Sequence, residues 1–490
     1  MGVTRRQLFT FMQNVVSVSA VLVLAGSIAL CARAQTRNPT SAANPFWGSV
    51  TTQPATGEVL KLSLDGAVER GFKTNLGLKE AENQERWLHG EKNEVLQEFF
   101  PTIDLKGDTG YYIHDLATFG FGPKVISEFG SLFPGGKMPA GFSTITSDYL
   151  TEGQIHYDEV LFSGPVIAGW KAVGAAERAA YFSKISARGE VVQRVATAYL
   201  RSIADESEVA NAKAQVAQAQ VFEDHAHAAH QAGTAANLDE LRARVELEAQ
   251  QQALIAAENQ QAKDLILLKR EIGIDPAQTI ELTDPAPYNE LAEQTPEEVR
   301  AIAYKSRKDY QNLQNQVVVY RSLHTAYRSQ RLPTLSFNSY YGTSTVNGVG
   351  THGNFIAVGT LSFPLFREAK LRGDEDASQA QLDAVNAQLA DLRNHIDEQV
   401  RTALLDVNAN KQLVDVARSN VDLATRALSD ETDRVNAGVD DNLPLVTAQA
   451  TLATAESNLV ESLYQYNVSK LVLARAAGVL EQQWRVYLGR

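Results

Sequence analysis

Apolar side chains recur every seven residues through two long parts of the chain. In the second half the series runs from Val400 to Val435, through Val407, Val414, Val421 and Leu428. Shorter series with the same spacing are Leu382, Leu389 and Ile396, then Ile185, Val192 and Tyr199, and finally Val209 and Val216. A sustained period of seven is typical of supercoiled helices, whereas an ordinary amphipathic helix, the alternative, drifts toward a spacing of about 3.6. The pattern therefore predicts long coiled-coil rods.

Each rod is predicted to fold back once, at Gly233 and at Gly438, where glycine permits a positive φ. Long helices are expected over residues 166–231 and 368–436, with return helices over 238–272 and 442–477. The first long helix would extend about 100 Å at roughly 1.5 Å per residue. A rod of that length indicates an architecture larger than a single globular core.

Strict alternation of apolar and polar side chains predicts four β-strands. They are expected over residues 101–112, 149–162, 333–342 and 353–365. Alternation over about ten residues that ends in aromatic side chains is typical of transmembrane strands. By itself, the alternation is equally compatible with a half-buried hairpin in a soluble periplasmic domain.

The chain contains an internal repeat. Phe100-Pro101-Thr102-Ile103 matches Leu332-Pro333-Thr334-Leu335 at an offset of 232 residues (333 − 101). The same offset relates Ser63 to Thr295, and the first helix of each repeat is expected to begin at these residues. At the second of them, Thr295-Pro296-Glu297-Glu298 predicts a capping box. The tips match at a shorter offset of 205 (438 − 233). The two offsets differ because repeat one has extra residues between its two strands. The rods therefore have the same lengths in both repeats, whereas the loop between the strands is longer in repeat one.

These patterns divide the chain into six segments. We expect a signal peptide over 1–34, an extended segment over 35–62, repeat one over 63–274, a proline-rich linker over 275–294, repeat two over 295–478 and a C-terminal tail over 479–490. The first helix of repeat one, expected over 64–98, is as long as the return helix over 238–272. Stacked end to end, these two helices would match the long helix and give a tube with walls of uniform height.

The N-terminus is typical of an export signal. Arg5 and Arg6 precede an apolar run over 15–30, and Ala32-Arg33-Ala34 supplies small residues for cleavage after Ala34. A membrane anchor is the alternative, but the run is shorter than the roughly 20 residues of a span. Lipidation at Cys31 is disfavoured because Leu30 before it is large. No later stretch is apolar enough for a transmembrane helix, so the exported chain is either soluble or a β-barrel.

Composition and charge exclude some functions. The formal net charge of −13 argues against a nucleic-acid binder, which would show a basic face. Cys31 is the one cysteine, so the exported part needs no disulfide. We find no glycine-rich phosphate loop, nucleophile elbow or paired carboxylates in a pocket-like context. We therefore expect no catalytic residues, no cofactor and no resident metal.

Four strands cannot span a bilayer alone, because a bilayer tolerates no open sheet edge. Two chains would give eight strands, whose interior side chains fill, and three would give twelve strands and an open lumen. If the strands span a membrane, the predicted fold is mainly α with a membrane β-barrel portion. Long coiled-coil hairpins would form a periplasmic tube, and four strands per chain would contribute to a twelve-strand barrel in a homotrimer.

The sequence resembles the TolC-type outer-membrane efflux protein family over nearly all of its exported part. The features that carry the resemblance are the two repeats, the strand entry Leu332-Pro333-Thr334-Leu335, the first-helix motif Asn75-Leu76-Gly77-Leu78, and the tips Ala232-Gly233-Thr234 with Leu238-Asp239 and Arg434-Val435-Asn436-Ala437-Gly438-Val439 with Thr447-Ala448-Gln449. The resemblance implies a trimeric channel-tunnel anchored in outer-membrane lipid. Its helical tube would dock with a periplasmic adaptor and an inner-membrane pump.

The resemblance also implies a gate, because family members close the periplasmic end with aspartates near the tips. Asp239 matches such a position in repeat one. In repeat two, acidic residues are expected where this chain has Pro444 and Thr447. Asp440 and Asp441 lie nearer the turn and are the alternative, although turns also favour aspartate for local reasons. The candidate tip and gate residues are Gly233, Asp239, Arg434, Gly438, Asp440 and Asp441.

Two further features near the tips have weaker assignments. Arg434 is either a docking contact or a surface charge. His227 and His230 share a helix face that His225 does not, which offers two metal ligands without a third. We expect these histidines to belong to a solvated helix end.

The sequence therefore predicts a passive exit duct from periplasm to exterior, with energy supplied by a partner pump. Two alternatives remain. A soluble periplasmic coiled-coil adaptor would share the hairpins but would lack four amphipathic strands. An exported enzyme on a helical scaffold would need a catalytic constellation.

Overall fold

The computed structural model describes residues 44–50, 54–115, 123–130, 145–234, 236–285, 288–346, 350–437 and 442–489. The expected signal peptide lies outside these residues. The chain divides into two compact units. The described residues of the sheet unit fall within His89–Gly174 and Val318–Leu382, and those of the rod unit fall within Leu30–Leu88, Ala175–Val317 and Asp383–Arg490.

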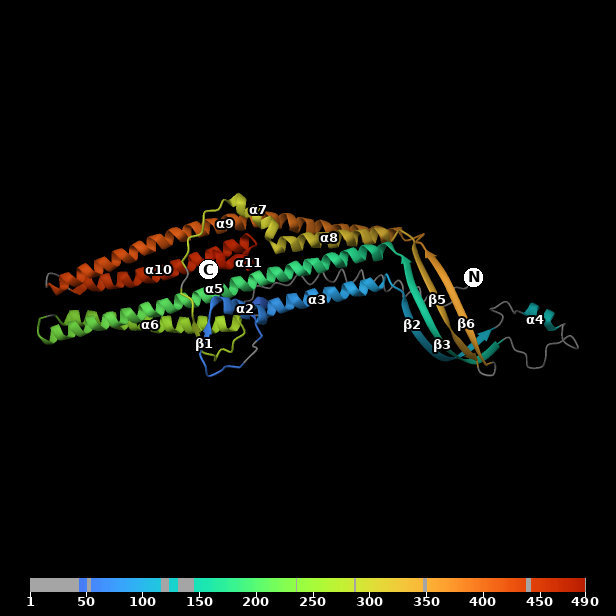
Figure 1. The fold of residues 1–490 in the computed structure, drawn as a ribbon, viewed down its shortest axis with the longest axis horizontal. Coiled ribbons are helices and arrows are strands. Elements are labelled where there is room, and N and C mark those ends of the chain that lie inside the picture. The colour runs from blue at the N-terminus through green and yellow to red at the C-terminus, as the bar shows by residue number, and fades with distance from the viewer. Residues whose placement is uncertain are drawn as a thin grey trace. The chain divides into compact units, whose positions relative to one another are not determined.

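The sheet unit is built on four antiparallel strands in the order β2-β3-β5-β6 (Figure 1). Their bounds are Thr102–Asp115 for β2, Ile145–Phe162 for β3, Thr334–Val346 for β5 and Gly350–Ser362 for β6. Pro101 and Pro333 stand directly before β2 and β5, where a missing N–H interrupts no ladder. Among the described residues, β2 and β6 each leave one edge without a partner strand.

Two helical hairpins dominate the rod unit, and Figure 1 shows each long helix folding back on a shorter one. The long helices are α5 (Gly164–Gln231, 68 residues) and α9 (Glu368–Asn436, 69 residues). The return helices are α6 (Asn237–Glu271) and α10 (Asn442–Ala476), with 35 residues each. The described helices contain no stretch that is both long and apolar enough to cross a membrane. The predicted hairpins, one in each repeat, are confirmed.

The heptad side chains lie inside the rod unit. Val400 and Val414 are fully buried, and Val192 and Tyr199 of α5 belong to the same apolar core. Complete burial of a valine side chain stabilises the fold by about 1.5–3 kcal/mol. The seam predicted from the seven-residue spacing therefore makes a large contribution to holding the helices together.

The first helix of each repeat is broken, so the continuous helix expected over 64–98 is wrong. The four resulting helices are α2 (Leu64–Thr74), α3 (Leu76–Gln97), α7 (Pro296–Ser306) and α8 (Lys308–Ser329). Asn75 and Arg307 separate the members of each pair with extended backbone, at ψ of 128° and 123°. Asn75 fixes its break by donating to the Phe46 carbonyl at 2.9 Å and accepting from the Leu78 amide at 3.2 Å. The capping box predicted at Thr295 is present.

Each break meets the end of a return helix at a left-handed glycine. Gly273 and Gly478 have φ of 67° and 74°. A Cβ on Gly273 would lie 2.6 Å from the Thr74 Cβ, and a Cβ on Gly478 would lie 2.6 Å from the Arg307 nitrogen. The return helices therefore end at the breaks, which corrects the expected end-to-end stacking of 238–272 on the whole of 64–98.

Several short elements are absent from the sequence predictions. They are η1 (Pro45–Trp47), β1 (Leu60–Leu62), α4 (Pro123–Gly130), β4 (Ile280–Leu282) and α11 (Leu480–Tyr487). β1 and β4 pair in parallel, so the expected extended segment and linker meet as a small sheet. The expected tail is a helix, because Leu480, Trp484 and Tyr487 of α11 are buried on one face.

Candidate functional site

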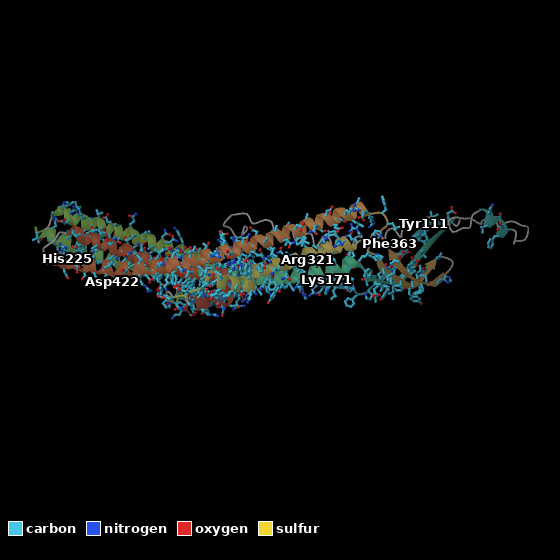
Figure 2. All side chains as sticks on the ribbon, turned by 90° about the horizontal axis from the view of Figure 1, so that it is seen from above. Tyr111, Lys171, His225, Arg321, Phe363 and Asp422 are labelled. Atoms are coloured by element: carbon cyan, nitrogen blue, oxygen red, sulfur yellow. The ribbon has the colours of Figure 1, made fainter. Side chains whose placement is uncertain are left out.

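One face of the sheet is apolar and exposed. Leu105, Ile155, Tyr341 and Phe355 pair in one row across β2, β3, β5 and β6. Leu105 is 81% exposed and Phe355 is 65% exposed. Figure 2 labels Tyr111, which stands on the same face of β2 and packs on Tyr149 with ring centroids 5.0 Å apart. Since soluble monomers rarely expose so continuous an apolar patch, this face is suited to an apolar environment.

The opposite face carries polar side chains that bond across the strands. Ser344 Oγ donates to Glu152 Oε1 at 2.8 Å, and Asn354 Nδ2 donates to Ser344 Oγ at 2.7 Å. Asn338 Nδ2 donates to Asp158 Oδ1 at 2.5 Å. The sheet thus presents an apolar surface on one side and, on the other, a surface of hydrogen-bonded polar side chains that also exposes Ile356 and Val358 of β6.

Large apolar side chains also gather where strands and helices meet in the sheet unit. The exposed members of this group are Phe99, Phe100, Phe162, Leu332, Phe363, Leu365 and Phe366. Phe366 is 99% exposed and Leu365 is 86% exposed, and Phe363 is labelled in Figure 2. Aromatic belts of this kind flank the apolar band of membrane proteins.

The tip of the first hairpin is a tight reversal at Gly233, whose φ is 73°. The Gly233 amide donates to the His230 carbonyl at 2.9 Å and the Thr234 amide to the Ala229 carbonyl at 3.0 Å. This pair of bonds ends α5 in a Schellman motif, which requires the left-handed residue. Nothing lies within 4 Å of a Cβ built at Gly233. The backbone conformation, rather than crowding, is therefore the reason for glycine.

Asp239 lies in the first turn of α6, where a negative charge interacts favourably with the helix dipole. Its Oδ1 lies 3.7 Å from Arg242 Nη1 one turn later. The contact is local to α6. A gating role for Asp239 stays a prediction.

His227 and His230 of α5 both face Glu240 of α6. His227 Nδ1 lies 2.7 Å from Glu240 Oε1, and His230 Nε2 lies 3.7 Å from Glu240 Oε2. Hydrogen bonding and charge from Glu240 raise the pKa of His227, and the same contact lowers the pKa of Glu240. The described residues contain no group of three or more side chains placed to hold a metal ion. Figure 2 labels His225, which takes no part in this contact.

The second tip is described only in part. Arg434 Nη1 lies 3.5 Å from Glu431 Oε1, one turn earlier in α9. Gly438, Asp440 and Asp441 lie outside the described residues. The structure therefore leaves the proposed acidic gate of this tip as a prediction.

An apolar cluster joins the two hairpins near their tips. Its buried members are Phe222, Ala226, Ala243, Ala424, Leu428, Leu445, Leu452 and Ala455, which come from all four rods. Beside it lies a groove of 360 Å³ lined by Phe222, Leu238, Leu241, Arg242, Val245, Glu246 and Val446. Leu238, Leu241 and Val245 are exposed in this groove, so the tip region has apolar surface available for a partner.

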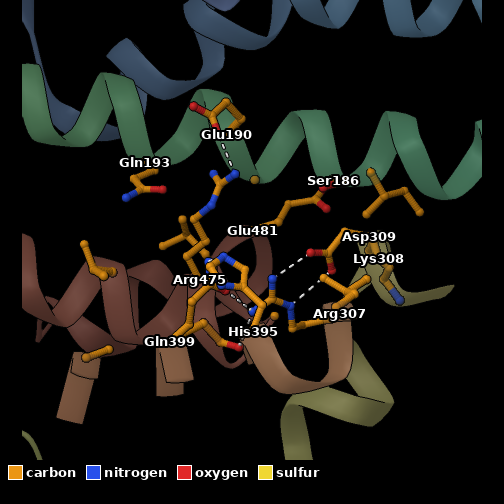
Figure 3. Close-up of a pocket in the computed structure, with 18 of the residues that line it drawn as sticks. Ser186, Glu190, Gln193, Arg307, Lys308, Asp309, His395, Gln399, Arg475 and Glu481 are labelled. Carbon is orange, nitrogen blue, oxygen red and sulfur yellow. Dashed lines mark hydrogen bonds and ion pairs between the residues drawn. The ribbon is translucent and has the colours of Figure 1, made fainter. Parts of the chain in front are cut away.

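A charged cleft of 640 Å³ surrounds the junction between α8 and α10 (Figure 3). Arg307 Nη2 donates to Asp309 Oδ2 at 2.6 Å, and its Nη1 donates to Gln399 Oε1 at 2.6 Å and to the Ala476 carbonyl at 3.4 Å. Burial would raise the pKa of Asp309, but Arg307 and the other nearby donors hold it below its usual value. Arg475 pairs with Glu190 of α5 in the same cleft.

The sequence analysis missed this junction, although one signal for it was available. The 232-residue offset relates Asn75, in a motif that carries the family resemblance, to Arg307 (307 − 75). Arg307 ties α8 to α9 and to the end of α10. The cleft is therefore a structural junction held by ion pairs.

The fold is similar to that of several solved outer-membrane proteins. The channel OprN matches with a TM-score of 0.71 and 15% identity, over 87% of this chain and 94% of that chain. The CmeC outer membrane channel of Campylobacter jejuni matches with a TM-score of 0.69 and 14% identity, over 89% and 92%. VceC, an outer membrane protein of Vibrio cholerae, matches with a TM-score of 0.69 and 15% identity, over 85% and 96%. At these identities the likeness establishes the class of fold.

The family is established by the sequence match. The family model for outer membrane efflux proteins matches residues 75–273 and 300–479. Because these ranges make up more than half of the chain, the protein belongs to the outer membrane efflux protein family. A search of curated proteins returns no match to this chain.

Proposed function

We propose that this protein is the outer-membrane exit duct of a multi-component export system and moves solutes from periplasm to exterior. The observation that carries the proposal is the two-faced sheet. Leu105 and Phe355 lie in an exposed apolar row, while Glu152 and Ser344 belong to the hydrogen-bonded polar face. An apolar outside in contact with lipid and a polar inside in contact with water are what a pore wall requires.

The open edges of the sheet support a homotrimer. Strands β2 and β6 each have a free edge within the described chain, and a free edge in a bilayer leaves N–H and C=O groups unpaired at a cost of several kcal/mol each. Pairing β2 of one chain with β6 of the next removes both edges. Three chains give twelve strands, which are enough to leave a lumen.

The rods offer matching surfaces for neighbouring chains. Away from the groove at the tip, apolar side chains are exposed on α6 at Ile255, Ile266 and Leu267, and on α9 at Leu405, Leu413, Val416 and Leu423. Within the described residues, α10 exposes no large apolar side chain. Helix α5 contacts both α6 and α10, as the pairs Lys213–Glu258 and Gln215–Glu456 demonstrate. The exposed faces of α6 and α9 are therefore suited to pack against the next protomer and close a tube.

The tips are the proposed docking end for a periplasmic adaptor, which would connect the duct to an inner-membrane pump. The apolar groove beside Leu238 and Leu241, and the left-handed turn at Gly233, support this assignment. Asp239, Arg434, Gly438, Asp440 and Asp441 are proposed as further tip or gate residues. In this proposal the channel is passive, and the pump supplies the energy.

Membrane fractionation and mass measurement test the proposal. We expect the protein in the outer-membrane fraction, and detergent extraction should yield trimers. Val416→Glu places a charge on the exposed face of α9 and should give monomers of unchanged helix content. Thr425→Glu, at an exposed position elsewhere on α9, should leave the trimer intact. A monomer that is soluble without detergent would refute the proposal.

A further inference from the structure

A row of polar side chains runs along the contact between α5 and α10. Three residues of α5 stand seven positions apart, the spacing that apolar side chains take elsewhere in the rods. Their contacts are Arg201 Nη1 to Glu461 Oε2 at 2.8 Å, Ser457 Oγ to Glu208 Oε1 at 2.9 Å, and Gln215 Nε2 to Glu456 Oε2 at 3.0 Å. Polar residues at heptad positions fix register but reduce stability. The contact between these parts of α5 and α10 is therefore polar.

Arg201 is surrounded by three carboxylates from three helices. Its Nε lies 2.9 Å from Asp205 Oδ1 on α5 and 3.8 Å from Asp264 Oδ2 on α6. Its Nη1 lies 2.8 Å from Glu461 Oε2 on α10. One guanidinium cannot neutralise three ionised carboxylates, so the cluster has an excess of negative charge unless a proton is added.

Asp205 is the buried member of the cluster, with 3% of its surface exposed. Its Oδ1 bonds Arg201, but no donor among the described residues reaches its buried Oδ2. The Asp264 carboxyl faces the same Arg201 Nε as Asp205, at 3.8 Å and 2.9 Å, and its interaction with Asp205 raises the pKa of Asp205. Two carboxylates cannot bond to each other, whereas a carboxylic acid donates to a carboxylate. Asp264 Oδ2 already accepts from Gln260 Nε2 at 2.8 Å, whereas a proton on Asp205 would let its buried Oδ2 donate to Asp264.

We propose that Asp205 and Asp264 form a proton-dependent latch in which a shared proton holds α6 against α5 and its release loosens α6. The latch deepens the proposed function and rests on it, since α5 and α6 would form part of the duct wall and one of its tips. Its ligand is the proton itself. It would couple the packing of one hairpin to periplasmic pH.

The surrounding charges set the pH range. The titratable and charged groups that face Asp205 are Arg201 on its own helix, Asp264 on α6, and Glu461 and Tyr464 on α10. Burial and then the hydrogen bond to Asp264 raise the pKa of Asp205 to about 7, against the opposing effect of Arg201. Because the folded pKa lies above the ordinary value of 3.8, the folded state loses stability as pH rises from about 4 to about 7.

A distance measurement between α5 and α6 tests the latch. Lys213 and Glu258 are exposed and lie 3.4 Å apart across the two helices. Lys213→Cys with Glu258→Cys, in a Cys31→Ala background, provides two sites for spin labels, because Cys31 is the one cysteine of the sequence. The exposed ion pair that these changes remove contributes little stability. The full-length protein in detergent is measured by pulsed electron paramagnetic resonance at pH 5.5 and pH 8.5.

We expect the label distance to lengthen or broaden at pH 8.5 in the parent protein. Asp205→Asn and Asp264→Asn each replace a carboxyl by a neutral amide and should abolish the change. Asp422→Asn alters an exposed aspartate paired with Arg426 on α9 and should preserve it. Equal distances at both pH values in the parent, or a change that persists in both amide variants, would overturn the latch. The readout needs no conduction, so its failure is distinguishable from failure of the duct.

Discussion

Gly478 packs against Arg307 where the end of α10 meets the break between α7 and α8. A Cβ on Gly478 would lie 2.6 Å from the Arg307 backbone nitrogen. Gly273 and Thr74 form the corresponding contact in repeat one, with 2.6 Å between the added Cβ and the Thr74 Cβ. The two repeats therefore share one construction, in which a left-handed glycine lets a return helix end against a broken first helix.

Gly478→Ala should destabilise the rod unit. The substitution combines a positive φ, which costs an L residue about 1–2 kcal/mol, with a backbone clash that no rotamer relieves. We expect a loss of about 2–4 kcal/mol in unfolding free energy. Gly189→Ala is the control, because Gly189 lies within α5 and an added Cβ meets nothing within 4 Å. That variant should be neutral or more stable by up to about 1 kcal/mol. Thermal unfolding of both variants is followed by circular dichroism. Equal melting temperatures would contradict the proposed role of Gly478 in the contact with Arg307.

The two faces of the sheet should respond differently to an arginine side chain. Leu105→Arg places a guanidinium on the apolar face, which costs about 2–4 kcal/mol near the bilayer midplane. Lys106→Arg places it one position along β2, on the polar face. We expect the first variant to be depleted from the outer membrane and the second to insert normally. Quantitative blotting of membrane fractions measures both, and normal insertion of Leu105→Arg would argue against a lipid-facing row.

The strands and rods could be predicted because their signals are local. The seven-residue series through Val414 and the alternation around Leu105 both report burial or exposure on one face of a regular element. The break at Asn75 could not be predicted in this way, because its side chain bonds Phe46 from a different segment. A single aspartate such as Asp205 resembles a solvated helix position until its distant partner Asp264 is placed beside it.

The short elements were missed for a related reason. β1 and β4 contain three residues each and pair only with one another. Leu60 therefore has a strand partner only in the folded chain, where Ile280 lies beside it. At the tips, Asp239 could be placed on its helix from sequence. A gating role for Asp239 could not be placed in this way, because such a role would depend on neighbouring chains.

Because of Lys470, the unfolding free energy should change with pH in the alkaline range. Its side chain is 0% exposed, and its Nζ donates to the Asn289 carbonyl at 3.1 Å. Burial lowers its pKa from 10.5 to about 8. Between these values the unfolded chain binds more protons than the folded chain, so stability rises with pH from about 8 to 10.5.

Lys470→Met keeps the bulk of the side chain and removes the charge. We expect it to raise the melting temperature at pH 7 and to flatten the rise between pH 8 and pH 10. Lys263→Met changes an exposed lysine of α6 and should retain the rise. Thermal melts at several pH values measure this effect. If the melting temperature of Lys470→Met rises with pH as steeply as that of the parent, the pH dependence of stability belongs to other groups.

Asp440 and Asp441 are the proposed gate residues of the second tip. Asp440→Ala with Asp441→Ala removes two negative charges per chain, and we expect a higher basal conductance or a weaker preference for cations. Asp422→Asn is the control, since this exposed aspartate of α9 is paired with Arg426 at 2.7 Å. Reversal potentials in asymmetric salt report selectivity. Unchanged conductance and selectivity would remove both aspartates from the gate.

Conductance through a planar lipid bilayer tests the central claim most directly. Detergent-extracted trimers added to one side should insert and produce discrete, reproducible current steps, because three chains would close twelve strands around a polar lumen. Leu105→Arg protein, prepared in the same way, should insert far less often. Trimers that bind the bilayer without any current steps, or protein that stays monomeric and soluble, would contradict the exit duct.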